Sequence, residues 1–110
     1  MEKKKRYGSV IALRPEHADY YKKLHANPWP EVLKTIKDCH IENYSIYLFN
    51  NMLFSYFEYT GDDYDADMQK MASDPITQEW WKECKPCQLP LEERKESEWW
   101  ADMDEVFHLD

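Results

Sequence analysis

Alternating side chains near the start of the sequence predict a first strand followed by a helix. In residues 7–13 the odd-numbered positions Tyr7, Ser9, Ile11 and Leu13 share one face, and Val10 and Ala12 share the other. A period of two residues is typical of a strand. Pro15 is suited to the first turn of a helix, which we expect to run to about His25. The beginning of the chain therefore predicts a strand followed by a helix.

A second helical piece is predicted directly after the first, at a bend. Asn27-Pro28 has the form of a cap followed by a first helical position, and Trp29 and Pro30 would lie in the bend. An apolar stripe then continues the helical pattern through Val32, Leu33 and Ile36. We therefore expect two helices in succession before the next strand.

Residues 41–59 predict a β-hairpin centred on Asn50-Asn51. Two runs rich in aromatic and β-branched residues flank this pair, and asparagine tolerates the positive φ angles of a two-residue turn. Counting outward from the turn gives one face with Tyr44, Ile46, Leu48, Leu53, Ser55 and Phe57, and another with Tyr47, Phe49, Met52, Phe54 and Tyr56. Neither face is polar, so we expect helices to cover one and a second subunit to cover the other.

The second half of the chain predicts helix, helix and strand. Asp62 is a candidate cap for a helix carrying Tyr64, Met68 and Met71, and Asp74-Pro75 restarts a helix with Ile76, Trp80 and Cys84 on one stripe. Residues 86–104 are polar and irregular, and residues 105–109 read as a short final strand.

The predicted order is strand, helix, strand, strand, helix, strand. This is the ferredoxin-like α+β pattern, an antiparallel sheet with helices on one face, here as one domain over residues 1–110. The aromatic second face of the sheet favours a homodimer formed through the sheet.

Composition narrows the classes of function. Two glycines, Gly8 and Gly61, cannot form a dinucleotide or phosphate-binding loop, or a Gly-x-Ser-x-Gly nucleophile elbow. The net charge of −8 disfavours nucleic acid as a partner. The sequence has no apolar run long enough to span a membrane, and three cysteines are too few and odd in number for a disulfide framework. We therefore expect a cytoplasmic protein that does not associate with a membrane.

His25 is the first candidate for chemistry. It follows Tyr21 by four residues, so both side chains would lie on one face of a helix. Histidine both gives and takes protons near neutral pH, although a structural or surface histidine fits the same pattern. His17 is a similar residue that we expect to face solvent.

Two further motifs carry less specific signals. Cys84-Lys85-Pro86-Cys87 has the spacing of a redox pair or half of a zinc site, but a second ligand pair is missing and the motif follows a helix instead of beginning one. In Trp80-Trp81 one ring can fill the core while the other lines a cleft, because neighbours on a helix diverge by about 100°. Trp99-Trp100 is equally ambiguous.

Four separated blocks resemble the L-rhamnose mutarotase family. They are Tyr21 with His25-Ala26-Asn27-Pro28-Trp29-Pro30-Glu31, then Asn43-Tyr44-Ser45-Ile46-Tyr47-Leu48, Trp80-Trp81, and Glu105-Val106-Phe107-His108-Leu109. The resemblance implies a dimeric α+β barrel that interconverts the anomers of L-rhamnose with no cofactor and no metal. It places the proton-donating histidine at His25 and the sugar-binding residues at Tyr21, Tyr44, Trp80 and Trp81.

Residues 82–104 depart from the family pattern. This segment holds the cysteine pair and Trp99-Trp100 and is long enough to reach a cleft and alter which 6-deoxysugar fits. Within the resemblance, His25 would move the proton of the ring oxygen while Tyr21 and Tyr44 hold hydroxyls or relay the second proton. A non-catalytic sugar-binding module is the alternative, and the fold by itself is also compatible with small haem-degrading or quinol-oxidising monooxygenases.

Overall fold

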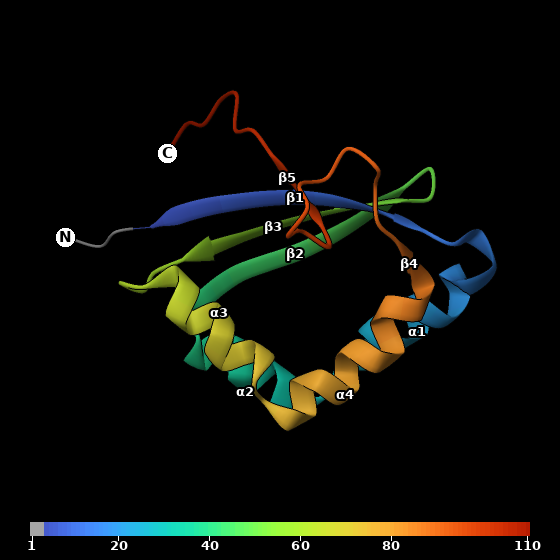
Figure 1. Cartoon of the computed structure of the whole chain (residues 1–110), viewed down its shortest axis with the longest axis horizontal. Coiled ribbons are helices and arrows are strands. Elements are labelled where there is room, and N and C mark those ends of the chain that lie inside the picture. Colours follow the sequence, from blue (N-terminus) through green and yellow to red (C-terminus); the bar gives the residue numbers. More distant parts are fainter. Residues whose placement is uncertain (1–3) are drawn as a thin grey trace.

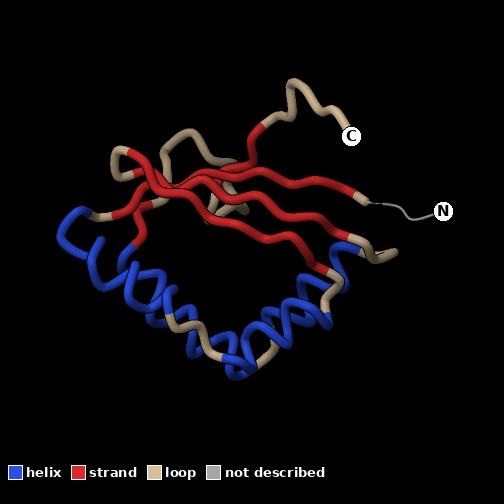
Figure 2. Tube along the Cα trace, turned by 180° about the vertical axis from the view of Figure 1, so that it is seen from behind, coloured by secondary structure: helices blue, strands red, loops and turns tan. Residues whose placement is uncertain are grey.

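A computed structural model describes residues 4–110 as a curled antiparallel sheet with a layer of helices against one face (Figure 1). The elements in chain order are β1 (Lys5–Leu13), η1 (Pro15–His17), α1 (Ala18–Ala26), α2 (Pro30–Asp38), β2 (Ile41–Phe49), β3 (Met52–Tyr59), α3 (Tyr64–Ala72), α4 (Pro75–Cys84), η2 (Lys85–Cys87), β4 (Gln88–Leu89) and β5 (Ala101–Met103). The predicted α+β class is confirmed. Seen from behind, the helices again lie together against one face of the sheet (Figure 2).

The sheet has the ferredoxin-like strand order β2-β3-β1-β4. Its last position is divided, because β4 pairs with the end of β1 at Leu13 and β5 pairs with the middle of β1 at Gly8 to Val10. The chain leaves the sheet after β4, runs through residues 90–100, and returns as β5. Residues 90–100 are therefore an excursion inserted into a single edge position of the sheet.

The predicted hairpin and its register are confirmed. Asn50 and Asn51 have φ angles of 55° and 60°, the left-handed values that a two-residue turn of this hand requires. Tyr47 pairs with Phe54 and Leu48 with Leu53, so the two faces divide as the sequence predicts. Farther along, the register shifts between Glu42 and Ser45, where an extra residue in β2 forms a bulge that the sequence did not indicate.

Helix beginnings follow local chemistry, with two corrections to the sequence prediction. The second helix begins at Pro30 instead of Pro28, because the Trp29 carbonyl accepts the first helical N–H bonds. The third is capped by Asp63 instead of Asp62, since the Asp63 carboxylate accepts from the Ala66 N–H at 3.1 Å. Asp74 caps α4 as predicted, through the Thr77 N–H at 2.8 Å.

The prediction of a terminal strand at residues 105–109 is wrong. The last strand is Ala101–Met103, and residues 104–110 are without regular structure. After β5 the Arg6 guanidinium donates to both carboxylate oxygens of Glu105, at 2.7 and 2.9 Å, as the chain leaves the sheet. Figure 1 shows this end on the side of the sheet opposite the helices. Although apolar residues alternate in 105–109, this segment pairs with no strand among residues 4–110.

The core lies between the inner face of the sheet and the helices. Ile11, Leu13 and Leu53 from the sheet are buried with Val32 of α2 and Trp80 of α4. The helix layer leaves the opposite face of the sheet uncovered, as Figure 2 shows. In residues 4–110, every helix lacks either the length or the apolar character that crossing a membrane requires.

Candidate active site

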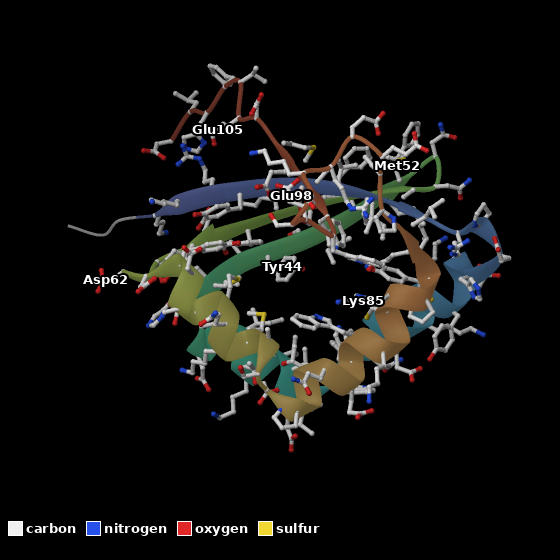
Figure 3. The ribbon with its side chains drawn as sticks, viewed as in Figure 1. Tyr44, Met52, Asp62, Lys85, Glu98 and Glu105 are labelled. Atoms are coloured by element: carbon white, nitrogen blue, oxygen red, sulfur yellow. The ribbon has the colours of Figure 1, made fainter. Side chains whose placement is uncertain are left out.

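All five residues that the sequence singled out for the site line one cavity under the inner face of the sheet. Its volume is about 290 Å³, and its walls come from strands β2, β3 and β4, from helices α1, α3, α4 and η2, and from the excursion 90–100. The five are His25, Tyr21, Tyr44, Trp80 and Trp81. In Figure 3, Tyr44 lies in the space between the sheet and the helices. The fold thus brings together side chains that are separated by as many as 60 positions along the chain.

His25 is held by a hydrogen bond to its own helix. Its Nδ1 lies 2.9 Å from the backbone carbonyl oxygen of Tyr21, and a carbonyl only accepts, so Nδ1 carries the proton. The imidazole stacks on the Tyr21 ring, with 4.1 Å between ring centroids. It also makes an edge-to-face contact with Trp80, with 5.1 Å between ring centroids. Within residues 4–110 Nε2 has no hydrogen-bond partner, so it is free to meet a ligand in the cavity.

Burial sets the protonation state of His25. Removal from water lowers the pKa of the imidazole below its usual value, and the bond to the Tyr21 carbonyl offsets only part of this effect. The ring is therefore neutral at pH 7, with a proton on Nδ1 and a lone pair on Nε2. In this state Nε2 is a proton acceptor, so His25 enters a reaction as a base.

Tyr21 lies deeper, below the imidazole, and is almost fully buried. Its hydroxyl accepts a hydrogen bond of 3.0 Å from the side-chain amide of Gln88. Burial raises the pKa of the phenol well above its usual range, and the bond from Gln88 counters this only in part. Tyr21 therefore keeps its proton and meets a ligand as a neutral phenol.

Tyr44 reaches the cavity from β2. The bulge between Glu42 and Ser45 includes Asn43, whose φ of 50° turns the backbone beside Tyr44. The Tyr44 ring then meets the edge of Phe57 at 5.5 Å, on the inner face of the sheet. Desolvation raises the pKa of Tyr44 to about 12, although 43% of the residue's surface is exposed. Tyr44 thus presents a neutral hydroxyl to the cavity.

Trp80 and Trp81 divide between core and cleft, as the sequence suggested. Trp80 is only 8% exposed and packs its ring against Trp29 and His25 with edge contacts of 5.1 Å each. Trp81 is half-buried on the cavity wall, with the Lys85 ammonium 5.0 Å from its ring centroid. Trp80 supports the histidine, whereas Trp81 offers an accessible aromatic face.

The sequence missed Gln88 and Lys85 and left Trp99 and Trp100 undecided. All four line the cavity, so the excursion does reach the cleft. The Trp99 indole N–H donates to the Gln88 side-chain oxygen at 2.8 Å, and the Lys85 ammonium lies 5.4 Å from the Trp99 ring. In the sequence, the Cys84–Cys87 spacing pointed to the thiols as the chemical groups of this segment. In the structure, Lys85 and Gln88 line the cavity together with Cys84.

The cysteines are free thiols buried in the core. Burial raises the pKa of Cys84 to about 12 and raises the pKa of Cys87 as well. Thiols that stay protonated are poor nucleophiles and poor metal ligands. Across residues 4–110, no three His, Cys, Asp or Glu side chains are grouped so that they would hold a metal ion.

The fold and the cavity define a class of protein first. This is an α+β half-barrel whose concave face holds a neutral histidine and two phenols among tryptophan rings, a site suited to binding a small ligand and moving its protons. Comparison with known proteins then gives the family. The family model described as L-rhamnose mutarotase matches residues 6–109, and the chain belongs to this family.

Curated relatives match over nearly their whole length. The chain is 36% identical to the L-rhamnose mutarotase of Oceanobacillus iheyensis and 32% identical to that of Bacillus subtilis, in both cases over 96% of this chain and 99% of the relative. Two crystal structures share the fold. An L-rhamnose mutarotase from Formosa agariphila has a TM-score of 0.75 at 24% identity, covering 96% of this chain and 99% of that one. Tetracenomycin F2 cyclase from Streptomyces glaucescens has a TM-score of 0.70 at 15% identity, covering 96% and 97%.

Proposed function

We propose that this protein is an isomerase that interconverts the α and β anomers of L-rhamnose, with His25 as its catalytic residue. The observation that carries the proposal is the hydrogen bond from His25 Nδ1 to the Tyr21 carbonyl, which orients the ring at the cavity and, in the neutral imidazole, leaves the lone pair on Nε2. The family match and the names of the relatives support L-rhamnose as the substrate.

The reaction needs one proton to move between two oxygens of the same carbon. His25 Nε2 takes the proton from the anomeric hydroxyl, the C1–O1 bond becomes a carbonyl, and the bond from C1 to the ring oxygen breaks with its electrons on that oxygen. The imidazolium then returns the proton to the ring oxygen, which gives the open aldehyde. Rotation about C1–C2 and the reverse steps close the ring on the other face. No redox change or outside proton is required, and one such group contributes about 10² to 10⁴-fold.

The remaining residues of the cavity bind and orient the sugar. Tyr21 and Tyr44 are neutral hydroxyls near the imidazole and suit the polar edge of the sugar. The exposed face of Trp81 suits the apolar side of the ring, including the C6 methyl group. In this proposal His25 first accepts a proton and then delivers it to the ring oxygen, and the lowered pKa of the buried imidazole supports that order.

We propose further that the protein acts as a homodimer joined through the outer face of the sheet. Tyr47 and Phe49 on this face are 66% and 76% exposed, beside the aromatic side chains of β3. The C-terminal segment, residues 104–110, lies on the same side of the sheet (Figure 1), and its apolar residues Val106 and Phe107 are exposed. Apolar surface of this extent is costly in water, and a second copy of the chain would cover it. A cytoplasmic location is proposed on the free, buried cysteines.

Anomer exchange by NMR tests the enzymatic proposal. Magnetisation transfer between the anomeric protons of L-rhamnose is measured with catalytic amounts of protein, and with other aldohexoses for comparison. We expect faster exchange for L-rhamnose than in buffer. A protein that binds the sugar without accelerating exchange would be the non-catalytic sugar-binding module instead.

The matched variants are His25→Ala and His17→Ala. We expect His25→Ala to lose about 10²-fold or more of the rate. His17 caps the start of α1 without a side-chain bond, so its variant should keep the wild-type rate. An unchanged rate in His25→Ala would refute the role assigned to His25.

A further inference from the structure

A chain of hydrogen bonds connects the excursion 90–100 to the catalytic cavity. The Trp99 indole N–H donates to the Gln88 oxygen at 2.8 Å, and the Gln88 amide donates to the Tyr21 hydroxyl at 3.0 Å. Gln88 belongs to β4, where it pairs with Leu13 of β1, and is 5% exposed. The three residues thus form one polar connection, which is buried between Gln88 and Tyr21 and part-buried at Trp99, itself 37% exposed.

The chemistry of the three groups fixes which group donates and which accepts in each of these hydrogen bonds. An indole nitrogen only donates, so the side chain of Gln88 must turn its oxygen toward Trp99. Its NH₂ group then faces Tyr21, and an NH₂ group cannot accept, so the phenol oxygen must be the acceptor of that bond. The proton of the Tyr21 hydroxyl is therefore directed away from Gln88. Within residues 4–110 this hydroxyl donates no hydrogen bond, and Tyr21 lines the cavity, so the proton is available to a ligand there.

Trp99 is well fixed in its role of orienting Gln88. The Lys85 ammonium lies between two indole rings, 5.0 Å from Trp81 and 5.4 Å from Trp99, so cation–π contacts join the excursion to α4. Backbone pairing of β4 and β5 with β1 holds both ends of the excursion on the sheet. The indole N–H is thus held at the Gln88 oxygen from several directions.

We propose that Gln88, oriented by Trp99, is a positioning residue that makes the Tyr21 hydroxyl a hydrogen-bond donor to the ring oxygen of the sugar. This inference rests on the proposed mutarotase function and adds residues of the excursion to the machinery. Neither Gln88 nor Trp99 needs to contact the reacting atoms, because both act through Tyr21.

The resulting polarity matches a cyclic hemiacetal. Its ring oxygen can only accept a hydrogen bond, and its anomeric hydroxyl must donate one for the ring to open. The Tyr21 hydroxyl offers the donor and His25 Nε2 offers the acceptor, on two rings stacked with 4.1 Å between centroids. A donor placed on the ring oxygen stabilises the negative charge that develops there as the C1–O bond breaks.

The decisive variant is Gln88→Glu, which keeps the shape of the side chain and reverses its polarity. A carboxylate accepts from both Trp99 and Tyr21, so the phenol proton is drawn away from the cavity. We expect kcat for anomer exchange to fall by about 10²-fold. The dissociation constant for L-rhamnose, measured by tryptophan fluorescence, should change by less than about threefold, because the hydrogen bond strengthens mainly in the transition state.

A double-mutant cycle separates positioning from general damage. In a Tyr21→Phe background the phenol proton no longer exists, so adding Gln88→Glu should cause no further loss of kcat. Gln69→Glu introduces the same chemical change on the exposed side of α3 and should match the wild type. Equal losses of kcat for Gln88→Glu in both backgrounds would overturn the proposal.

Trp99→Phe provides a second route should the Gln88 variant not fold. Phenylalanine keeps an aromatic ring beside Lys85 but removes the N–H, so the amide is free to turn over. We expect kcat to fall several-fold to about tenfold, with little change in thermal stability. Wild-type kcat in Trp99→Phe would refute the positioning role. Absence of exchange by the wild-type protein would instead refute the mutarotase function on which the inference depends.

Discussion

At the residue scale, the site depends on two neutral side chains whose pKa values move apart. Burial lowers the pKa of His25 and raises the pKa of Tyr21, so at pH 7 one has a free lone pair and the other keeps its proton. The same low-polarity surroundings act on both, and the opposite directions follow from the charge of each ionised form. A proton acceptor, His25 Nε2, and a hydrogen-bond donor, the Tyr21 hydroxyl, therefore lie on neighbouring rings. The proposed chemistry requires no metal ion.

The pH dependence of the reaction should report His25. Only the neutral imidazole accepts the anomeric proton, so kcat/KM is expected to be constant near pH 7 and to fall only below the usual histidine value of about 6.5. The unfolded chain binds this proton more readily than the folded one, so the free energy of unfolding also decreases as pH falls from about 6.5 toward the lower pKa of the folded state. Exchange NMR from pH 5 to 8 measures the profile. A limb centred above 6.5 would contradict the lowered pKa.

The two adjacent tryptophans should separate stability from binding. Trp80→Ala removes a buried ring from the core and is expected to lower the free energy of unfolding by about 3 to 5 kcal/mol. Trp81→Ala should cost less stability but weaken L-rhamnose binding by about tenfold, which corresponds to about 1.4 kcal/mol. Denaturant unfolding and sugar titration measure the two effects. Equal losses of stability and unchanged sugar affinity in Trp81→Ala would contradict this division.

At the element scale, the hairpin and the β2 bulge show what local sequence specifies and what it leaves out. Asn50-Asn51 identifies its turn because few residues accept positive φ at consecutive positions. The bulge that aims Tyr44 at the cavity has no comparable signal, since the register shift arises from pairing with β3. Likewise the true cap, Asp63, stands beside an equally suitable Asp62, and only the bond to Ala66 distinguishes them.

The turn provides a prediction about stability. Asn51→Val should lower the free energy of unfolding by about 1 to 2 kcal/mol, because a β-branched side chain is strained at a φ of 60°. Asn51→Gly accepts the same backbone without strain and is the control, expected to equal or exceed the wild type. Chemical denaturation of both variants measures the difference. A Val variant as stable as the Gly variant would show that the turn relaxes.

At the scale of the whole molecule, the helices cover one face of the sheet only (Figure 1). The helices lie against the inner face (Figure 2), where the cavity is also found. On the outer face the aromatic side chains of Tyr47 and Phe49 are exposed to solvent. A fold that places its cavity on one side of the sheet leaves the other side free for association. The proposed dimer therefore belongs to the whole molecule and not to any one motif.

A charge placed on the outer face should weaken the proposed dimer. Tyr47→Lys adds charge at an exposed aromatic position of β2 and is expected to shift sedimentation toward the monomer by at least about tenfold in dissociation constant. Ile76→Lys, on α4 at the helix layer, is the control and should leave association unchanged. A wild-type protein that sediments as a monomer at every concentration would refute the dimer.

The sequence by itself determined the general order of the elements, the hairpin, the family and five of the residues that line the cavity. Periodicity, turn chemistry and motif blocks are local properties, and they can be read from neighbouring letters. The tertiary structure decided that residues 101–103 and not 105–109 pair with β1, that Gln88 connects Trp99 to Tyr21, and that burial lowers the pKa of His25. Each of these depends on contacts between distant residues or on burial, because pairing partners, hydrogen-bond polarity and pKa arise only when the chain is folded.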